Sequence, residues 1–195
     1  MERILGAAEE LLREKAFESV TVAEIVRRAD SSVGAFYARF PAKAALLSAL
    51  YARRHGTRQT ERGRSYLVHF ASRRMTLEER AREVVGQMVT YYRLNRRLLR
   101  SLGAAERPSP TSGVPEADAY HNAFSRGWTA AFLAHRHEIG HPDRERAVRI
   151  GLFMVASACR EAVVFSTPVL ERGEMSEKEL AEELASALVA YLEAG

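Results

Sequence analysis

The sequence predicts an all-α protein in which a small N-terminal helical unit precedes a larger helical region. Apolar residues recur along the chain at the 3.6-residue spacing of amphipathic helices, and the alternating β-branched runs that indicate strands are missing. Polar turns, prolines and glycines divide these periodic stretches into segments of ordinary helix length. We therefore expect a helical domain over residues 1–52 and a second all-α domain over residues 53–195.

The composition is that of a globular protein that needs no cross-link to fold. The chain has 195 residues, of which 47% are hydrophobic and 28% are charged, and a chain of this length can bury roughly 70% of its unfolded surface. Cys159 is the single cysteine, so no disulfide can form within the chain. No apolar run approaches the roughly 20 residues of a membrane span, and the charged start does not resemble a signal peptide. We expect a cytoplasmic protein.

Charge is distributed unevenly along the chain, although the net charge is only +4. Residues 1–52 carry seven basic and seven acidic side chains, residues 53–107 carry fourteen and five, and residues 108–195 carry eight and thirteen. A basic middle segment suits a polyanion, but arginine-rich helix faces are equally often just solvated. Charge alone therefore does not establish nucleic-acid binding.

The first fifty-odd residues contain four short helical segments. The first has an apolar stripe of isoleucine and leucine on a charged helix. Thr21 and Glu24 form a T-x-x-E capping box that opens the second helix. A polar turn at residues 30–32 leads into a brief third helix, which Pro41 stops because proline disfavours helical backbone in the residue before it. A fourth helix should run over residues 42–54.

The rest of the chain predicts four longer helices. We expect them over residues 76–102, 116–139, 143–167 and 176–192, with a Pro/Ser/Gly-rich loop at residues 106–115. Gly56 and Gly63 are expected to interrupt or end the helix that precedes this region. The last helix carries an i, i+4 stripe suited to packing on a partner helix, made of Leu180, Leu184, Leu188 and Leu192.

The second and third helices, joined by a tight turn, have the proportions of a helix-turn-helix. A short third helix can enter a DNA major groove about 12 Å wide. Thr21 and Ser32 at helix N-termini offer hydroxyls and backbone N–H groups to phosphates. Phe36 and Phe40 lie at i and i+4 and should hold the third helix on the first two. A plain three-helix bundle is the alternative, and the agreement of capping box, turn and aromatic residues disfavours it.

The stretch from Thr21 to Leu47 resembles the DNA-binding headpiece of the tetracycline-repressor (TetR) family. The family pattern is a small residue, a hydrophobe, Tyr, two residues, Phe, a short gap, Lys and then Leu. Here it is met by Ala35, Phe36, Tyr37, Phe40, Lys43 and Leu46. Together with the helix positions, the resemblance implies a set of DNA-contacting residues: Thr21, Ser31, Ser32, Val33, Gly34, Ala35, Tyr37 and Lys43.

The resemblance also implies a homodimer that binds a palindromic operator, usually as a repressor released by a small ligand, and whose last two helices pair across the dimer axis. The headpiece departs from the family pattern at two places. Asp30 and Ser31 occupy a turn that often has Gly followed by an apolar residue, and Val33 stands where a basic or polar residue is common. Because Val33 and Ala35 cannot hydrogen-bond base edges, phosphate contacts and the basic segment 53–64 must supply much of the affinity.

A set of rings and sulfur atoms in the second region suits an adaptable apolar ligand pocket. Ordinary core packing explains each member equally simply, so both interpretations stay open. The candidate ligand-binding residues are Met88, Tyr91, Tyr92, Phe124, Trp128, Phe132, Phe153, Met154 and Phe165.

Enzymatic and metal-binding functions have little support in the sequence. No nucleophile elbow, P-loop or paired-carboxylate spacing is present, so we expect neither an enzyme nor a cofactor. His135 and His137 would lie about 200° apart on a helix, and a solvated histidine cluster fits them and His141 better than a metal site. The leading hypothesis is a ligand-released repressor. The alternative is a dimeric regulator without a small ligand, controlled by a protein partner or acting as an activator.

Overall fold

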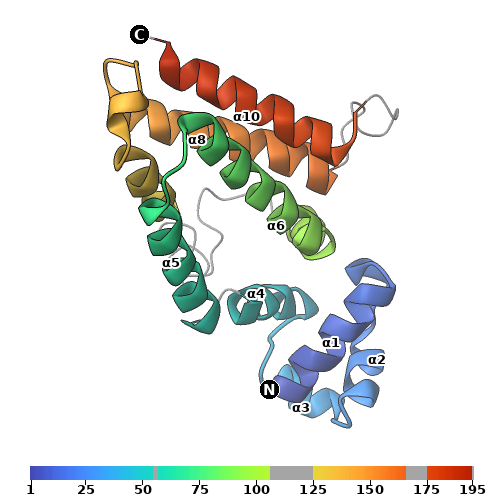
Figure 1. Cartoon of the computed structure of the whole chain (residues 1–195). Helices are drawn as coiled ribbons and strands as arrows, with labels where there is room; N and C mark the ends of the chain where they lie inside the picture. Colours follow the sequence, from blue (N-terminus) through green and yellow to red (C-terminus); the bar gives the residue numbers. More distant parts are fainter. Residues whose placement is uncertain (55–56, 106–124, 166–174, 195) are drawn as a thin grey trace. The chain divides into compact units, whose positions relative to one another are not determined.

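The computed structural model describes residues 1–54, 57–105, 125–165 and 175–194 of the chain (Figure 1). Every regular element in these ranges is helical, which confirms the predicted fold class. The described residues form two units. The first unit contains residues 1–54, 57–59 and 97–105, and the second unit contains residues 60–96, 125–165 and 175–194.

Five helical elements build most of the first unit: α1 (Glu2–Glu14), the 3₁₀ turn η1 (Phe17–Ser19), α2 (Val22–Arg28), α3 (Val33–Tyr37) and α4 (Lys43–Arg54). Helix α1 packs against α2 and α4, while α3 packs against α2. Apolar side chains from all of these elements meet in one core, in which Leu5, Ile25, Phe36 and Leu46 are almost fully buried. The apolar stripes that predicted these helices are therefore the faces that they bury.

Local hydrogen bonds set the ends of α2. Thr21 is its N-cap and forms the predicted capping box with Glu24. At the other end, the amide of Ser31 donates to the Val26 carbonyl (2.8 Å) and that of Asp30 donates to the Arg27 carbonyl (3.2 Å). This is a Schellman arrangement, which satisfies carbonyls that a helix end leaves without partners. The turn into α3 therefore has a fixed geometry.

The C-terminal part of α6 (Leu77–Ala105) also belongs to the first unit. Leu98 lies in the same core as α1 and α4. The guanidinium of Arg97 donates to the carbonyls of Leu12 and Arg13, which are among the last carbonyls of α1. One long helix thus contributes residues to both units.

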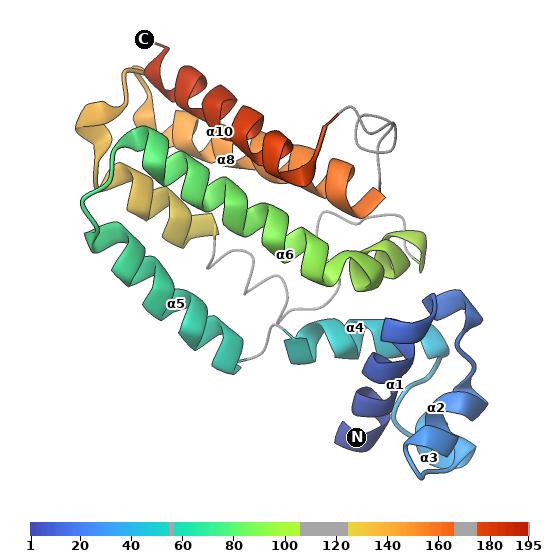
Figure 2. The same cartoon turned by 45° about the vertical axis from the view of Figure 1, so that its right-hand side comes forward.

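The second unit contains α5 (Thr57–Ser72) from residue 60 onward, most of α6, a helix over residues 125–133, the 3₁₀ turn η2 (Arg136–Glu138), α8 (Arg144–Cys159), the π-helical turn η3 (Arg160–Val164) and α10 (Glu177–Glu193). Helices α8 and α10 run side by side in both views of the chain (Figures 1 and 2). They approach closely at Gly151, where an added Cβ would lie 2.6 Å from the Cδ1 atom of Leu188. Their shared core includes Val148, Leu152 and Leu192.

Several expectations about the second region were wrong in detail. Gly63 does not interrupt α5, because Leu67 and Phe70 bury one face of that helix and packing outweighs the cost of one glycine. The helix after residue 125 ends at residue 133 instead of continuing to Ile139. Ile139 is extended and 1% exposed, so its burial takes precedence over another helical turn.

The predicted helix over residues 143–167 is regular only as far as Cys159 and then widens into the π-turn η3. The leucine stripe of α10 packs inside the chain's own core, since Leu180, Leu188 and Leu192 are all buried there. The predicted loop at residues 106–115 and the first part of the helix at 116–139 lie outside the described residues. None of the described helices is long and apolar enough to cross a lipid bilayer.

Candidate nucleic-acid interface

Helix α3 has one buried face and one exposed face. Phe36 is completely buried, and its ring packs edge-on against Tyr37 (5.3 Å between centroids) and at a tilt against Phe40 (5.2 Å). Val33 and Tyr37, at i and i+4, are 47% and 52% exposed and share the outer face. The packing of Phe36 against Phe40 thus fixes α3, while the side chains of Val33 and Tyr37 remain available for contact.

The start of α3 is also open to solvent. Ser32 is its N-cap, and the hydroxyl oxygen accepts from the Ala35 amide at 3.1 Å. A Cβ added at Gly34 would meet only the Ser32 hydroxyl, at 3.9 Å. Ser31, Ser32 and Gly34 are exposed and Ala35 is half-buried. The five sequence-predicted residues from Ser31 to Ala35 therefore form one accessible segment that a DNA backbone or groove could approach.

Thr21 is exposed, but its hydroxyl is already hydrogen-bonded. It accepts from the Glu24 amide (3.2 Å) and donates to the Glu24 carboxylate (2.9 Å). Lys15 donates to the other oxygen of that carboxylate at 2.6 Å. The bond from Lys15, one from the Thr21 backbone amide (2.8 Å) and the one from the Thr21 hydroxyl together lower the pKa of Glu24 to about 2. A phosphate contact by the Thr21 hydroxyl therefore competes with the capping box and stays a prediction.

Lys43 points inward at the start of α4. Its ammonium donates to the Phe17 carbonyl (2.6 Å) and the Glu18 carbonyl (3.3 Å), and it lies 4.4 Å from the centroid of the Phe17 ring. Burial lowers the pKa of this ammonium below its usual value. An ammonium has three N–H donors, so one remains for a phosphate. The arrangement makes Lys43 a tie between α4 and η1 as well as a candidate phosphate contact.

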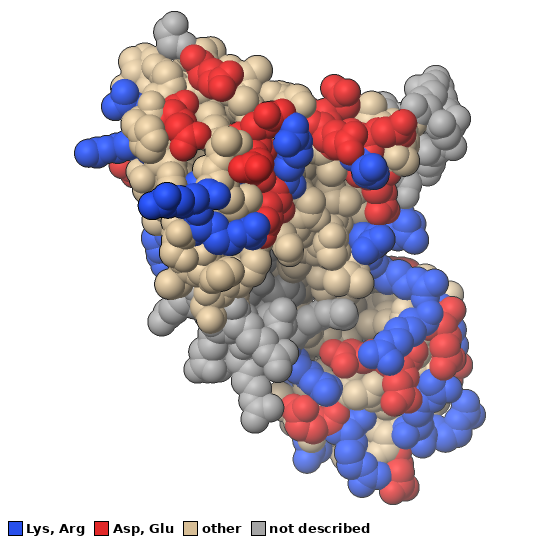
Figure 3. Space-filling view, in the orientation of Figure 1, with Lys and Arg blue, Asp and Glu red and all other residues tan. Residues whose placement is uncertain are grey.

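Ion pairs neutralise much of the charge on the first unit. Arg3 pairs with Asp30 (2.6 Å) and Arg28 with Glu14 (2.7 Å). Figure 3 shows acidic and basic side chains interspersed over this unit, and residues 1–52 are formally neutral. The candidate interface is therefore defined by the shape and exposure of α3 instead of by an excess of positive charge.

Two arginines that the sequence reasoning left out lie close to α3 in the chain. Arg39 is exposed and donates one bond, from Nη1 to the Ala35 carbonyl at 2.8 Å. Arg27, near the end of α2, is exposed and has no ion pair within the part of the chain that the structure describes. A guanidinium has five donors, so both can still bind phosphate oxygens. The sequence could have indicated these two arginines, because Arg27 comes just before the turn and Arg39 just after α3.

The turn between α2 and α3 carries backbone strain. Asp30 has a φ of 46°, in the left-handed region that favours glycine. Its carboxylate and its carbonyl both accept from Arg3 of α1. The residue that departs from the usual turn pattern therefore adopts the conformation that a glycine would supply.

The predicted ligand-binding residues divide into two groups in the second unit. Trp128 and Phe132 are buried in its core, Met88 and Tyr92 pack against that core, and half-buried Tyr91 contacts Tyr92 edge-on. Phe124 lies outside the described residues. The remaining three residues form a second, exposed group. The exposed members are Phe153 (70%), Met154 (44%) and Phe165 (42%).

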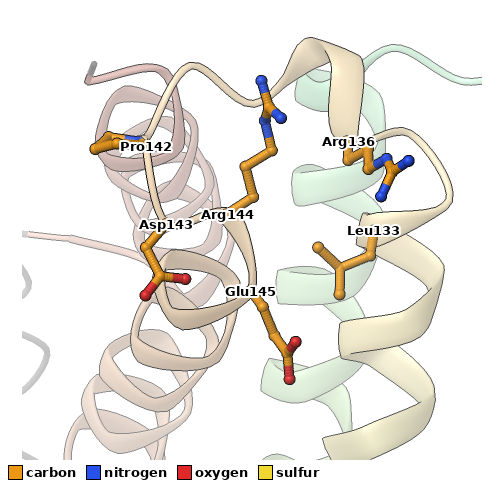
Figure 4. Close-up of a pocket in the computed structure, with 6 residues that line it drawn as sticks. All are labelled: Leu133, Arg136, Pro142, Asp143, Arg144 and Glu145. Carbon is orange, nitrogen blue, oxygen red and sulfur yellow. The ribbon is translucent and has the colours of Figure 1, made fainter.

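A surface hollow in the second unit has a charged lining (Figure 4). It involves Leu133, Arg136, Pro142 and the first residues of α8, and it contains none of the predicted ligand-binding residues. Nearby, His135 and His137 each lie 3.8 Å from the Glu138 carboxylate. Among the described residues, no group of three or more His, Cys, Asp or Glu side chains is placed to hold a metal ion.

A short helix with one buried and one exposed face, following a fixed turn, is the arrangement found in helix-turn-helix DNA-binding domains. Residues 4–50 match the model of the family described as bacterial regulatory proteins, tetR family. Over these residues the chain therefore has the DNA-binding domain of TetR-family transcriptional regulators. This confirms the resemblance that the residues from Thr21 to Leu47 indicate.

Solved structures with the same fold extend the similarity over nearly the whole chain. A TetR-family transcriptional regulator from Mesorhizobium loti is 18% identical, with a TM-score of 0.67 over 98% of this chain and 94% of that one. GusR of Salmonella enterica is 23% identical, with a TM-score of 0.59 over 99% and 95%. FadR of Bacillus subtilis, solved in complex with stearoyl-CoA, is 18% identical, with a TM-score of 0.60 over 100% and 98%. None of the curated proteins matches the chain in sequence.

Proposed function

We propose that the chain is a homodimeric repressor that binds a palindromic operator through α3 and releases it when a small effector binds the second region. The exposed outer face of α3, with Val33 and Tyr37 held out by buried Phe36, is the observation that carries the DNA-binding part. Val33 and Ala35 would contact thymine methyl groups, and the Tyr37 hydroxyl would reach a phosphate or a base edge. As a bacterial regulator, it would act in the cytoplasm.

We assign phosphate contacts to the cations and exposed polar groups that surround α3. Ser31, Ser32 and Gly34 would lie against the backbone at the start of the helix, while Arg39 and Lys43 would bind phosphates beyond its end. Because this assignment places only two cations of the first unit, Arg39 and Lys43, on phosphates, few counterions would be released on binding. The salt dependence of operator affinity should therefore be moderate unless the basic segment 53–64 also contacts DNA.

An exposed apolar face on α8 supports dimerisation through the C-terminal helices. Ile150, Phe153 and Met154 are 38%, 70% and 44% exposed, and their i, i+3, i+4 spacing places them on one side of the helix. Contiguous exposed apolar side chains typically mark protein interfaces. In the proposed dimer α8 supplies this face, while the leucine stripe of α10 remains in the core of each protomer.

Release by an effector requires a connection between the two regions, and α6 offers one. Its N-terminal part lies in the core of the second unit, and Arg97 in its C-terminal part is hydrogen-bonded to α1. A shift of α6 would move the end of α1 and change the match of the two headpieces to successive major grooves. FadR, which has the same fold, was solved with an acyl-CoA, so an effector with a long apolar part is a reasonable first class to test.

The alternative without a small ligand rests on a specific observation as well. Trp128 and Phe132 are at most 2% exposed and pack tightly against neighbouring helices. If the aromatic set is ordinary core, the protein would respond to a protein partner or act constitutively. Ligand screening with the full chain decides between the two forms of the proposal.

Selection of bound fragments from genomic DNA, followed by footprinting, tests the DNA-binding proposal. We expect protection of a palindromic site at low salt, with two half-sites about one helical turn apart. Tyr37→Ala and Arg39→Ala should each weaken protection without changing the circular dichroism spectrum. Absence of a protected site for the wild-type chain would contradict the proposal.

Sedimentation equilibrium tests the dimer. Phe153→Asp places a charge in the centre of the proposed apolar face, so the dimer dissociation constant should rise roughly a hundredfold or more. Val68→Asp is the matched control, because Val68 is equally exposed (68%) but lies on α5. Equal association of the two variants would show that α8 is not the interface.

A further inference from the structure

An arginine with almost no polar partners is enclosed in the core of the second unit. Arg80 of α6 is 0% exposed, and its Nη2 atom donates to the Met75 carbonyl at 3.0 Å. The Nε and Nη1 atoms are buried and make no hydrogen bond to any residue that the structure describes. One of the five guanidinium N–H groups is therefore used, and a complete two-donor edge remains available.

Arg80 forms no ion pair with any residue in the described ranges. The described part of the chain contains no acidic oxygen within 4.0 Å of the guanidinium, although Glu138 contributes a more distant favourable charge. The Glu138 carboxylate is itself engaged, because it accepts from the Leu77 amide at 2.7 Å. Burial lowers the pKa of Arg80, yet a guanidinium stays protonated in proteins. A buried cation without a counterion is costly and rarely persists without a role.

The surroundings of Arg80 are apolar and aromatic. Its guanidinium carbon lies 5.4 Å from the centroid of the Phe70 ring. Phe70 packs edge-on against Trp128 at 5.0 Å, and Val84 and Phe132 complete the same core. An anion that reached this place would find charge-assisted donors at one end and only rings and aliphatic side chains around the rest of it. This combination suits a molecule with one small anionic group and an apolar body.

We propose that Arg80 is the anchor for the carboxylate of an amphiphilic monocarboxylic acid, whose apolar part lies among Phe70, Trp128 and Phe132. A planar carboxylate matches the two-donor edge of a guanidinium. A phosphate dianion brings a second charge that the single cation cannot balance in an apolar core. The inference deepens the proposed effector control and rests on it. Because Arg80 is fully covered in the described structure, binding must locally open the core around α6.

Isothermal titration calorimetry and thermal unfolding of the full-length protein test this assignment. The probes are decanoate and 5-phenylpentanoate, each compared with its alcohol, and decyl phosphate, all below their aggregation concentrations. For the wild-type chain we expect at least one acid to bind ten times or more tightly than its alcohol, and more tightly than decyl phosphate. Equal binding of acids and alcohols, or a preference for the phosphate, would overturn the proposal.

Variants separate anchoring from a structural role. Arg80→Met keeps the length of the side chain and removes the charge, so the preference for the acid should disappear while the unliganded melting temperature stays equal or rises. Arg80→Lys keeps the charge without the planar fork and should retain part of the preference. Arg82→Met is the matched control, because Arg82 is an exposed arginine of the same helix, and it should keep the full preference.

Two results with the variants would contradict the inference. Persistence of the acid preference in Arg80→Met would place the carboxylate elsewhere, and a clear loss of stability in unliganded Arg80→Met would make Arg80 a structural group. Operator binding is measured on the same samples. If the operator is bound but no acid is preferred, the inference fails and the DNA-binding proposal stands. If no operator is bound, the proposed function fails by itself.

Discussion

The two units of this chain differ in how completely their buried polar groups are hydrogen-bonded. In the first unit, the charged groups of Arg3, Lys15 and Arg28 are paired at the surface, and the cap of α2 is complete. In the second unit, Arg80 and Asn95 are buried with polar atoms that have no hydrogen-bond partner among the described residues. A unit whose buried polar groups are all hydrogen-bonded keeps one shape. A helix that binds in a DNA groove needs such a fixed shape. Unsatisfied buried groups are typical of places where a protein gains from binding something else.

The largest expected effect concerns the aromatic core under α3. Phe36→Ala should destabilise the first unit by about 3–5 kcal/mol, because it empties a fully buried site. Tyr37→Ala, one residue along and half-exposed, should change stability by less than about 1 kcal/mol while it weakens operator binding. Urea unfolding followed by circular dichroism measures the first effect. Similar destabilisation by both variants would remove the distinction between the two faces of α3.

In the second unit, the strongest test of close packing is Gly140→Ala. The added Cβ would lie 2.4 Å from the Glu193 carbonyl oxygen at the end of α10, so backbone must move. We expect a loss of about 1–3 kcal/mol in thermal unfolding. The matched control is Gly86→Ala in α6, where an added Cβ meets nothing within 4 Å. That variant should gain about 0.5–1 kcal/mol, and a loss there would show that this face of α6 is occupied.

Relief of strain in the turn should stabilise the first unit by a smaller amount. Asp30→Gly removes the cost of a left-handed aspartate and sacrifices an Arg3 ion pair that is 66% and 95% exposed. Because exposed pairs contribute little, a net gain of roughly 0.5–1 kcal/mol is expected. Differential scanning calorimetry measures it. A decrease in melting temperature would mean that the Arg3 contact matters more than the strain.

The smallest effect is the pH dependence that the capping box of α2 contributes. The pKa of Glu24 is about 2 in the folded chain and about 4.5 when unperturbed. A depressed carboxylate pKa stabilises the fold above the unfolded value, and this contribution is lost as the pH falls from 4.5 towards 2. Glu24→Gln should therefore flatten the melting-temperature profile over that interval, and Lys15→Gln should flatten it in part. An unchanged profile for Glu24→Gln would show that the cap carries no such linkage.

Much of the first unit could be predicted because its signals are local. Thr21 and Glu24 identify a helix start from four residues, and the spacing of Phe36, Tyr37 and Phe40 separates buried from exposed faces. Arg27 and Arg39 could not be recognised as unpaired, because pairing depends on which acids α1 brings near them. The inward direction of Lys43 was likewise invisible, since its carbonyl partners belong to η1, about 25 residues away.

The sequence by itself determined that the protein is helical, that a helix-turn-helix opens it, and that its TetR-like residues fall in register. These features depend on helical periodicity, capping and turn chemistry, which act over a few residues. Only the tertiary structure decided that α5 continues through Gly63, that Ile139 turns inward and that the leucines of α10 face their own core. It also enclosed Arg80 without a counterion from the described part of the chain. Burial is a property of contacts between distant segments, and no short stretch of sequence specifies which segments will meet.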